Sequence, residues 1–376
     1  MRWDIFCRVV DNFGDIGVCW RLARQLVNEQ GRWVRLIVDD WRALRHLIPA
    51  APETPGACLL DGVEVHPWSL AEGAADTVEC VIEAFACELP GAYRSAMRSR
   101  TTAPVWLNLE YLSAEAWIED CHGLPSPDPA TGLAKYFFFP GFTPRTGGLI
   151  RECDVFERRD AAQGIDGRMV WQARHAVAGG SAASRWVSLF CYENAALPGL
   201  LAAWRADPHP TLLWVPEGKA MREVGRCLDM APVAGQQLRA DALTVRALPF
   251  LALRDYDALL ALCDLNFVRG EDSFVRAQWA ARPMVWQAYP QSDGSHLVKV
   301  SAFLARYAAA LPVQTQAVVQ SFWMAWNQGR DVHTLWPAYA ATQSEQARHA
   351  RQWCRALERQ GDLARRLVDF VDGIVK

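Results

Sequence analysis

The chain has 376 residues, of which 51% are hydrophobic and 22% are charged, and its formal net charge is −3. This composition indicates a globular protein long enough for two domains of ordinary size. The balance of charge excludes the basic field that drives binding to nucleic acid or anionic membranes, and no apolar run approaches a membrane span. Eleven cysteines are scattered singly without a CxxC pair, so we expect reduced thiols, no zinc site and a cytoplasmic protein.

The first half alternates short apolar segments with helical or loop stretches. The segments that read as strands are residues 3–10, 35–38, 63–66, 77–83 and 105–109. Such alternation predicts a parallel, doubly wound sheet.

The first of these strands leads into the sequence VVDNFGDIGVCWRLARQ, which places Asp11 and Asp15 on a turn before a helix expected over residues 18–29. Ligands of open α/β sheets bind at the carboxyl ends of the strands. Gly14 and Gly17 allow a sharp turn and a close approach by a ligand. A simpler alternative is that Asp15 caps the helix and Asp11 merely ends the strand. The spacing is not GxGxxG, so it does not predict a dinucleotide site.

A passage rich in proline and glycine, residues 123–148, interrupts this pattern and reads as long loops. A second series of strands starts at residues 186–190 and continues through 211–215 and 243–247. We therefore expect a domain boundary between residues 150 and 180. The stretch 343–371 has the spacing of one or two amphipathic helices.

The second chemically informative segment is LNFVRGEDSFVRAQWAA, residues 265–281. A strand ends at Val268, a tight loop follows, and a helix begins at once. The free N–H groups of that helix and the Arg269 guanidinium together form a natural seat for phosphate. Alternatively, Ser273 or Asp272 is only a helix N-cap. Ligand-binding groups at strand ends in both halves predict an enzyme with a cleft between two domains.

Several longer strings extend these two motifs along nearly the whole chain. They are FACELPGAYR, LNLEYLSAE, PSP, FFFPGFTPRTGGLIRE, SLFCYEN and VRGEDSFVRAQWAARPMVWQAYPQ. Together with the DNFGD turn, they resemble the EarP family of arginine rhamnosyltransferases that modify translation elongation factor P. The resemblance implies an α/β protein of the GT-B glycosyltransferase fold, with two facing Rossmann-like domains and a cleft between them. We expect domains at residues 1–155 and 180–340, with helices over 341–376 that pack back across the domains.

The resemblance also implies an activity. It is the transfer of L-rhamnose from dTDP-β-L-rhamnose, with inversion, to one arginine of elongation factor P, which helps ribosomes through consecutive prolines. No cofactor, metal, nucleic acid or membrane is expected. The fold alone does not choose the reaction, so another GT-B activity, such as transfer to a small molecule or sugar-nucleotide epimerisation, is the alternative enzyme class. A binding protein without turnover is the non-enzymatic alternative.

Carried over position by position, the resemblance assigns catalytic roles to Asp11, Asp15 and Glu271. The positions assigned to donor binding are Phe13, Gly14, Gly17, Phe190, Tyr192, Phe250, Arg269, Gly270, Asp272, Ser273 and Tyr289.

The chemistry explains why carboxylates belong in such a site. An arginine guanidinium has no free lone pair and holds its protons strongly, so it needs a base before it can attack a sugar carbon. We expect Asp15 to be that base, Asp11 to orient the guanidinium and Glu271 to hold the sugar or the acceptor. Arg269 and the helix start at Ser273 would stabilise the departing dTDP without a metal. Phe190 or Phe250 would stack on the thymine, although either could be an ordinary core residue.

Overall fold

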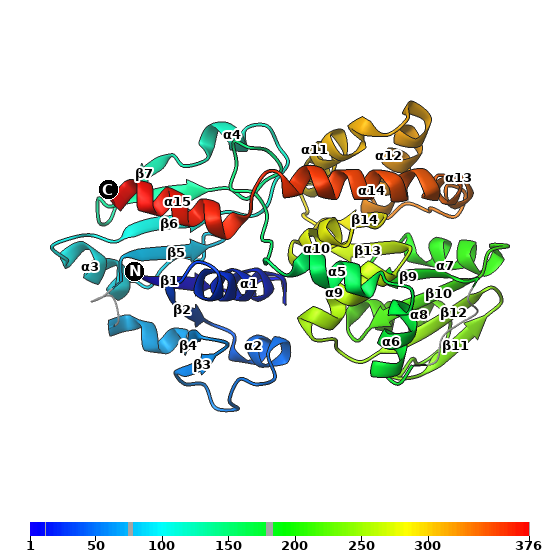
Figure 1. Ribbon diagram of the computed structural model, residues 1–376, viewed down its shortest axis with the longest axis horizontal. Coiled ribbons are helices and arrows are strands. Elements are labelled where there is room, and N and C mark those ends of the chain that lie inside the picture. The colour runs from blue at the N-terminus through cyan, green and yellow to red at the C-terminus, as the bar shows by residue number, and fades with distance from the viewer. Residues whose placement is uncertain (12, 74–77, 178–182, 376) are drawn as a thin grey trace. The chain divides into compact units, whose positions relative to one another are not determined.

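The computed structural model describes residues 1–11, 13–73, 78–177 and 183–375. The chain forms two compact units: unit 1 comprises Met1–Cys153 and Leu357–Lys376, and unit 2 comprises Asp154–Ala356 (Figure 1). The expected domain start at residue 180 and the expected strand start at residue 77 lie outside the described residues.

Unit 1 is built on an eight-stranded sheet in the order β3-β4-β2-β1-β5-β6-β8-β7. Its strands are β1 Arg2–Cys7, β2 Trp33–Val38, β3 Cys58–Leu60, β4 Val63–Pro67, β5 Cys80–Ala84, β6 Val105–Leu109, β7 Pro125–Pro127 and β8 Ala134–Phe138. Its helices are α1 Gly14–Asn28, α2 Trp41–Leu47, the 3-10 helix η1 Trp68–Gly73, α3 Gly91–Ser99, α4 Ile118–Cys121 and α15 Leu363–Val375. All the strand pairs are parallel except those of the edge strands β3 and β7, which run antiparallel to β4 and β8. The doubly wound sheet is confirmed.

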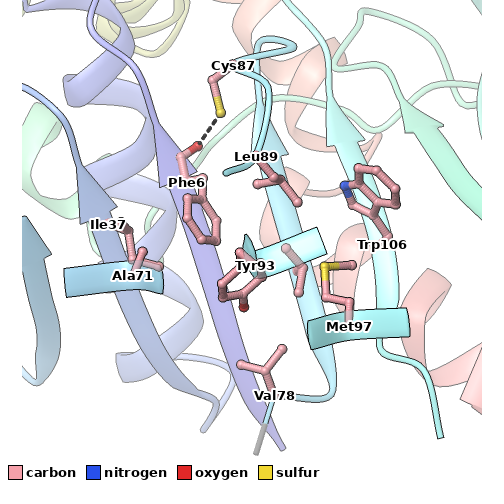
Figure 2. Packing of buried hydrophobic residues seen from close by; sticks show 10 residues of the cluster. Phe6, Ile37, Ala71, Val78, Cys87, Leu89, Tyr93, Met97 and Trp106 are labelled. Atoms are coloured by element: carbon pink, nitrogen blue, oxygen red, sulfur yellow. Dashed lines mark hydrogen bonds between the residues drawn. The ribbon is translucent and has the colours of Figure 1, made fainter. Parts of the chain in front are cut away.

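The core of unit 1 lies where η1 and α3 cover β1, β5 and β6. Phe6 of β1 contacts Trp68 and Tyr93 edge-on, with ring centroids 5.3 and 4.7 Å apart, and Figure 2 shows Tyr93, Met97 and Trp106 in the same layer. Burial of this apolar surface contributes about 25 cal/mol per Å² to folding. This packing holds in place the strands whose carboxyl ends lead into the polar loops.

Unit 2 contains a six-stranded sheet in the order β11-β12-β10-β9-β13-β14, parallel except for the edge strand β11. Its strands are β9 Arg185–Leu189, β10 Thr211–Pro216, β11 Gln237–Ala240, β12 Leu243–Leu248, β13 Leu265–Arg269 and β14 Met284–Gln287. Its helices are α5 Val155–Ala162, α6 Gly167–Arg174, α7 Leu197–Ala206, α8 Lys219–Cys227, α9 Leu253–Leu262, α10 Asp272–Ala280, α11 Ser295–Tyr307, the 3-10 helix η3 Ala308–Ala310, α12 Val313–Asn327, α13 Trp336–Ala341 and α14 Gln343–Glu358. Among the helices that can be described in the two units, none combines the length and the apolarity needed to cross a membrane.

Many of the aromatic side chains of unit 2 pack together beside β13 and β14. Phe274 of α10 stacks on Trp286 of β14 at 4.1 Å, and Phe303 of α11 meets both rings. Trp323 of α12 and Tyr307 of α11 extend this layer. These contacts hold α10 against the sheet and so fix the start of α10, which follows the end of β13.

Two expectations from the sequence need correction. The first helix begins at Gly14, four residues earlier than expected, and β1 ends at Cys7. The passage 123–148 is not loop throughout, because it contains β7 and β8. The aromatic residues of Ala134–Phe138 pair with β6, and the two prolines of β7 are tolerated because it is an edge strand.

Candidate active site

In each sheet the strand order reverses at the first strand of the unit. β1 has β2 on one side and β5 on the other, and β9 has β10 and β13. Open α/β sheets bind ligands beyond the carboxyl ends of the strands at this switch point. β1 leads to Asp11 and Asp15, β9 leads to Phe190 and Tyr192, and β13 ends at Arg269. The fold therefore places both sequence motifs at switch points.

Asp15 is the second residue of α1, and its side chain turns back toward β1. Oδ2 accepts hydrogen bonds from the backbone N–H groups of Val10 at 2.8 Å and Asp11 at 2.9 Å, and Oδ1 accepts the Tyr111 hydroxyl at 3.3 Å. These N–H groups precede the helix, whose N-cap, Phe13, makes no side-chain cap bond. The alternative that Asp15 caps α1 is therefore wrong. Its side chain is 3% exposed and is held by both oxygens.

The surroundings of Asp15 make it a stronger base than an exposed carboxylate. Burial raises its pKa, and the nearby Asp11 carboxylate raises it further. The hydrogen bonds from the two backbone N–H groups and from Tyr111 act in the opposite direction without reversing the shift. A raised carboxyl pKa lies closer to neutral pH, where a general base works best.

Asp11 and its neighbours form the tight turn between β1 and α1. The Gly14 N–H donates to the Asp11 carbonyl at 2.7 Å, and a Cβ atom on Gly14 would lie 3.1 Å from Asp11 Oδ2. Glycine at this position therefore leaves room for the half-buried Asp11 carboxylate. The Phe13 ring stacks on His46 at 4.8 Å, and the Gly17 N–H donates to the Phe13 carbonyl at 2.9 Å.

In unit 2, the Arg269 guanidinium packs over two aromatic rings. Its Cζ lies 4.5 Å from the ring centroid of Phe190 and 4.3 Å from that of Tyr192. Arg269 is 7% exposed, and its buried Nη1 makes no hydrogen bond to any residue that the structure describes. A desolvated guanidinium that is held by rings and retains an unused donor is suited to bind an anion.

The loop after Arg269 leads directly into α10. The Ser273 Oγ accepts the Arg269 backbone N–H at 3.0 Å and donates to the Arg269 carbonyl at 2.6 Å, so this hydroxyl braces the loop. Gly270 has φ +60°, the left-handed region that glycine favours. The N-cap is Glu271 without a side-chain cap bond, so the alternative that Ser273 or Asp272 is a side-chain N-cap is wrong. Glu271 and Asp272 are half-buried at the start of α10.

The other predicted donor residues lie at strand ends of the same sheet. Tyr289, which follows β14, is 49% exposed and meets Tyr192 edge-on at 5.3 Å. The Gln287 side chain accepts the Tyr192 N–H at 2.9 Å and so ties this loop to β14. Phe250 follows β12 and is half-buried. Phe190 is half-buried, presents its ring to Arg269 and touches Tyr256 edge-on.

A sequence profile described as Elongation-Factor P (EF-P) rhamnosyltransferase EarP matches residues 3–372. The chain belongs to this family. A protein-arginine rhamnosyltransferase of Pseudomonas aeruginosa is 49% identical over 370 residues, covering 98% of both chains. A solved structure described as the basis for EarP-mediated arginine glycosylation of translation elongation factor EF-P is 35% identical, with a TM-score of 0.71 and 99% coverage of both chains.

The comparisons also confirm the fold class. A glycosyltransferase structure from Rickettsia africae matches with a TM-score of 0.54 at 10% identity, covering 100% of this chain and 98% of that one, and so shows the fold alone. The family and the two Rossmann-like sheets together identify the GT-B fold of glycosyltransferases.

Reasoning from the sequence missed the contact between Tyr111 and Asp15. Tyr111 follows β6, two strands away from β1 in the sheet, and only the strand order brings it to Asp15. The sequence signal was present, because Tyr111 follows closely after an apolar strand, as Asp11 does. Within the part of the chain that is described, no group of three or more His, Cys, Asp or Glu side chains is placed to hold a metal ion.

Proposed function

We propose that this protein transfers L-rhamnose from dTDP-β-L-rhamnose to an arginine side chain of elongation factor P, with inversion at the sugar carbon. Membership of the EarP family supports this reaction class. The observation that carries the proposal is the buried Asp15 carboxylate, which is fixed at a switch point by two backbone N–H groups and has a raised pKa.

In the proposed step, Asp15 Oδ1 takes a proton from the acceptor guanidinium while that nitrogen attacks the anomeric carbon. A carbon–nitrogen bond forms, the bond from the anomeric carbon to the dTDP oxygen breaks, and dTDP leaves with the electron pair. Attack from the face opposite the leaving group converts the β-linked donor into an α-linked product. A positioned base of this kind contributes about 10²- to 10⁴-fold to the rate.

Asp11 and Glu271 complete the proposed set of carboxylates. A carboxylate matches the two parallel N–H groups of a guanidinium, so Asp11, at the turn beside Asp15, is suited to orient the acceptor. Glu271, at the start of α10, is suited to accept hydrogen bonds from the sugar hydroxyls or from the acceptor. Phe13, Gly14 and Gly17 would act by shaping the turn that carries Asp11.

On the donor side, Arg269 and the N-terminus of α10 would stabilise the negative charge that develops on dTDP. Because the Ser273 hydroxyl is engaged with the Arg269 backbone, a phosphate contact at this residue would come from its N–H group. Tyr192, Phe250 and Tyr289 offer aromatic surface for the base or the sugar. Arg269 and the N-terminus of α10 supply the positive charge without a metal, so we expect full activity in EDTA.

The acceptor would have to be read as a folded surface, because one guanidinium offers little to recognise. The loops near residues 108–111 and 139–145 of unit 1 are the proposed docking surface, in the cytoplasm where elongation factor P works. Alignment by the surrounding surface supplies much of the lowering of the barrier in such transfers. Free arginine and a short peptide of the target loop should therefore be far poorer substrates than the folded domain that carries this loop. Equal efficiency on peptide and folded domain would contradict the docking proposal.

The experiment that tests the function is intact-mass analysis of elongation factor P after incubation with this protein and dTDP-rhamnose. The expected result is the addition of one rhamnosyl group, located on arginine by fragmentation. A parallel incubation without elongation factor P tests the alternative GT-B activities, because an epimerase or a small-molecule transferase would change the donor without the protein acceptor. An unmodified elongation factor P would contradict the proposal.

A further inference from the structure

The loop that follows β5, Phe85 to Glu88, has an unusual backbone. Phe85, Ala86 and Glu88 have φ values of 57°, 53° and 58°, the left-handed region that side chains other than glycine rarely adopt. Residues in this region are strained and persist only when their surroundings hold them there. The loop lies at the carboxyl end of β5, which pairs with β1 at the switch point of unit 1.

The surroundings do hold this loop, because every one of its residues is hydrogen-bonded to the sheet. The bonds run from the Phe85 N–H to the Leu109 carbonyl (2.7 Å), from the Ala86 N–H to Asn108 Oδ1 (3.0 Å), from the Cys87 thiol to the Phe6 carbonyl (3.5 Å) and from the Glu88 N–H to Glu83 Oε1 (2.9 Å). The thiol contact is drawn in Figure 2. Asn108 and Glu83 are themselves buried in β6 and β5. The loop is thus a rigid support.

This rigid loop presents one aromatic ring to Tyr111. The rings of Phe85 and Tyr111 stack with their centroids 4.3 Å apart and their planes at 15°. The Tyr111 hydroxyl reaches Asp15 Oδ1 at 3.3 Å, although the Tyr111 side chain is 38% exposed. A long, half-exposed side chain would otherwise sample several rotamers. The stack on Phe85 therefore restricts where the hydroxyl can lie.

We propose that Tyr111, held in place by Phe85, is a positioning residue that fixes the orientation of the Asp15 carboxylate and the direction in which its Oδ1 accepts a proton. This inference rests on the proposed role of Asp15 as the base. Oδ2 already accepts two backbone N–H groups, so Oδ1 is the oxygen with room for a further partner. The Tyr111 hydroxyl fills one direction around Oδ1 and leaves the other to the acceptor.

During transfer the proton of the guanidinium moves to Oδ1, and the Tyr111 hydroxyl can then rotate to accept that proton in a hydrogen bond. No proton leaves Tyr111. The titratable groups that act on Asp15 are Asp11 on the turn and Tyr111 after β6, and the buried Cys7 thiol at the end of β1 lies within electrostatic reach of the same carboxylate. Because the Tyr111 bond favours the charged carboxylate, its removal should raise the pKa of Asp15 and move the acid limb of the rate to higher pH.

The test compares Tyr111→Phe, which keeps the stacked ring, with Phe85→Leu, which keeps the hydroxyl. Tyr111→Phe should lower the single-turnover rate about tenfold, since losing one hydrogen bond to a charged group typically changes an equilibrium by about that factor. It should also raise the pH of half-maximal rate by about one unit. Phe85→Leu should lower the single-turnover rate and raise the pH of half-maximal rate, each by less than Tyr111→Phe does. Added to Tyr111→Phe, it should cause no further change in either.

Tyr136→Phe is the matched control, because it removes a tyrosine hydroxyl from β8 of the same unit where the ring packs on Phe370. It should leave rate and pH profile unchanged. NMR titration of the isotope-labelled Asp15 carboxyl measures the same coupling without turnover, so it decides the inference even if no rhamnose is transferred. A higher Asp15 pKa in Tyr111→Phe than in the wild type supports the inference. An unchanged Asp15 titration in Tyr111→Phe would overturn it, while rhamnose transfer by the wild type would leave the proposed function standing.

Discussion

The two switch points of this molecule share an architecture and differ in the charge that they hold. In unit 1, the central strand leads to a carboxylate, Asp15, which is fixed by backbone N–H groups and a tyrosine hydroxyl. In unit 2, the corresponding edge carries a guanidinium, Arg269, which is held by the rings of Phe190 and Tyr192. Each charge is more than nine-tenths buried, so each was desolvated during folding at a cost.

The difference shows how one fold can serve two opposite tasks. Hydrogen bonds fix the direction of the Asp15 lone pairs, as proton transfer requires. Aromatic faces hold the Arg269 guanidinium without using up its N–H groups, which leaves Nη1 available to an anion. We therefore expect substitutions at the switch point of unit 1 to lower the rate of transfer, and substitutions at the switch point of unit 2 to weaken donor binding.

The largest expected effect is that of Asp15→Asn on the rate. The amide oxygen can still accept the Val10 and Asp11 N–H groups, so the turn should persist, while the basic oxygen is lost. The single-turnover rate should fall by about 10²- to 10⁴-fold. Asp39→Asn is the matched control, because Asp39 accepts the Val9 N–H at 2.9 Å from the end of the neighbouring β2 and should tolerate the change. Near-normal turnover by Asp15→Asn would remove it from the role of base.

The next effect is that of Arg269→Ala on the donor. Loss of the guanidinium should weaken binding of dTDP about 100-fold, because hydrogen bonds to charged groups contribute about 1.5–3 kcal/mol each. Arg168→Ala is the control: Arg168 also packs over an aromatic ring, Trp186 at 4.6 Å, but it is paired with Asp264 at the amino end of β13. Calorimetry with dTDP measures both. If Arg269→Ala binds dTDP as the wild type does, Arg269 has only a structural role.

A smaller effect is expected from Gly14→Ala, which adds one Cβ at 3.1 Å from Asp11 Oδ2. The Asp11 carboxylate must shift by a few tenths of an ångström, and we expect a roughly 3- to 10-fold higher KM for elongation factor P if Asp11 orients the acceptor. The melting temperature should not fall, since alanine is the better helix former and Gly14 begins α1. An unchanged KM would separate Asp11 from acceptor binding.

The smallest effect concerns the pH dependence of stability at the loop after β8. The Phe139 N–H donates to Nδ1 of His122 at 3.0 Å, and burial, with nearby Arg366, lowers the pKa of His122 to about 4. The folded state therefore resists protonation, so stability is full above the unfolded pKa of about 6.5 and falls as the pH drops toward 4.

In His122→Asn, an amide oxygen can accept the same N–H without titrating. After allowance for solvent screening, the wild type should lose about 1 kcal/mol more than this variant between pH 7 and pH 4.5. Urea unfolding at the two pH values measures the difference. Equal losses would show that His122 does not titrate on unfolding.

The sequence predicted the elements of this fold better than their arrangement. Apolar runs marked β6 at its observed bounds and the succession of strand, loop and helix at β13 and α10, because buried parallel strands read as continuous apolar segments. The short edge strand β7 escaped prediction because its prolines argue against a strand until an edge position is known. The strand order depends on contacts distant in sequence, which no local pattern carries.

The same limit applies to the candidate site. Asp11, Asp15 and Arg269 could be named from the sequence, because charged residues directly after apolar strands stand out. The stack of Phe85 on Tyr111 could not be named from the sequence. It depends on the pairing of β5 with β6 and on a loop in which three residues other than glycine adopt left-handed backbone angles. The sequence left two roles open for Phe190, stacking on the thymine or packing in the core. Only the structure shows that its ring packs against the Arg269 guanidinium.

The division of labour between the two units is tested most directly by titrating dTDP-rhamnose into Asp15→Asn. If the carboxylate of unit 1 acts only on the acceptor, the affinity for the donor should stay within a few fold of the wild type while transfer is lost. A loss of donor affinity as large as that expected for Arg269→Ala would contradict the account, because Asp15 would then contribute to holding the donor.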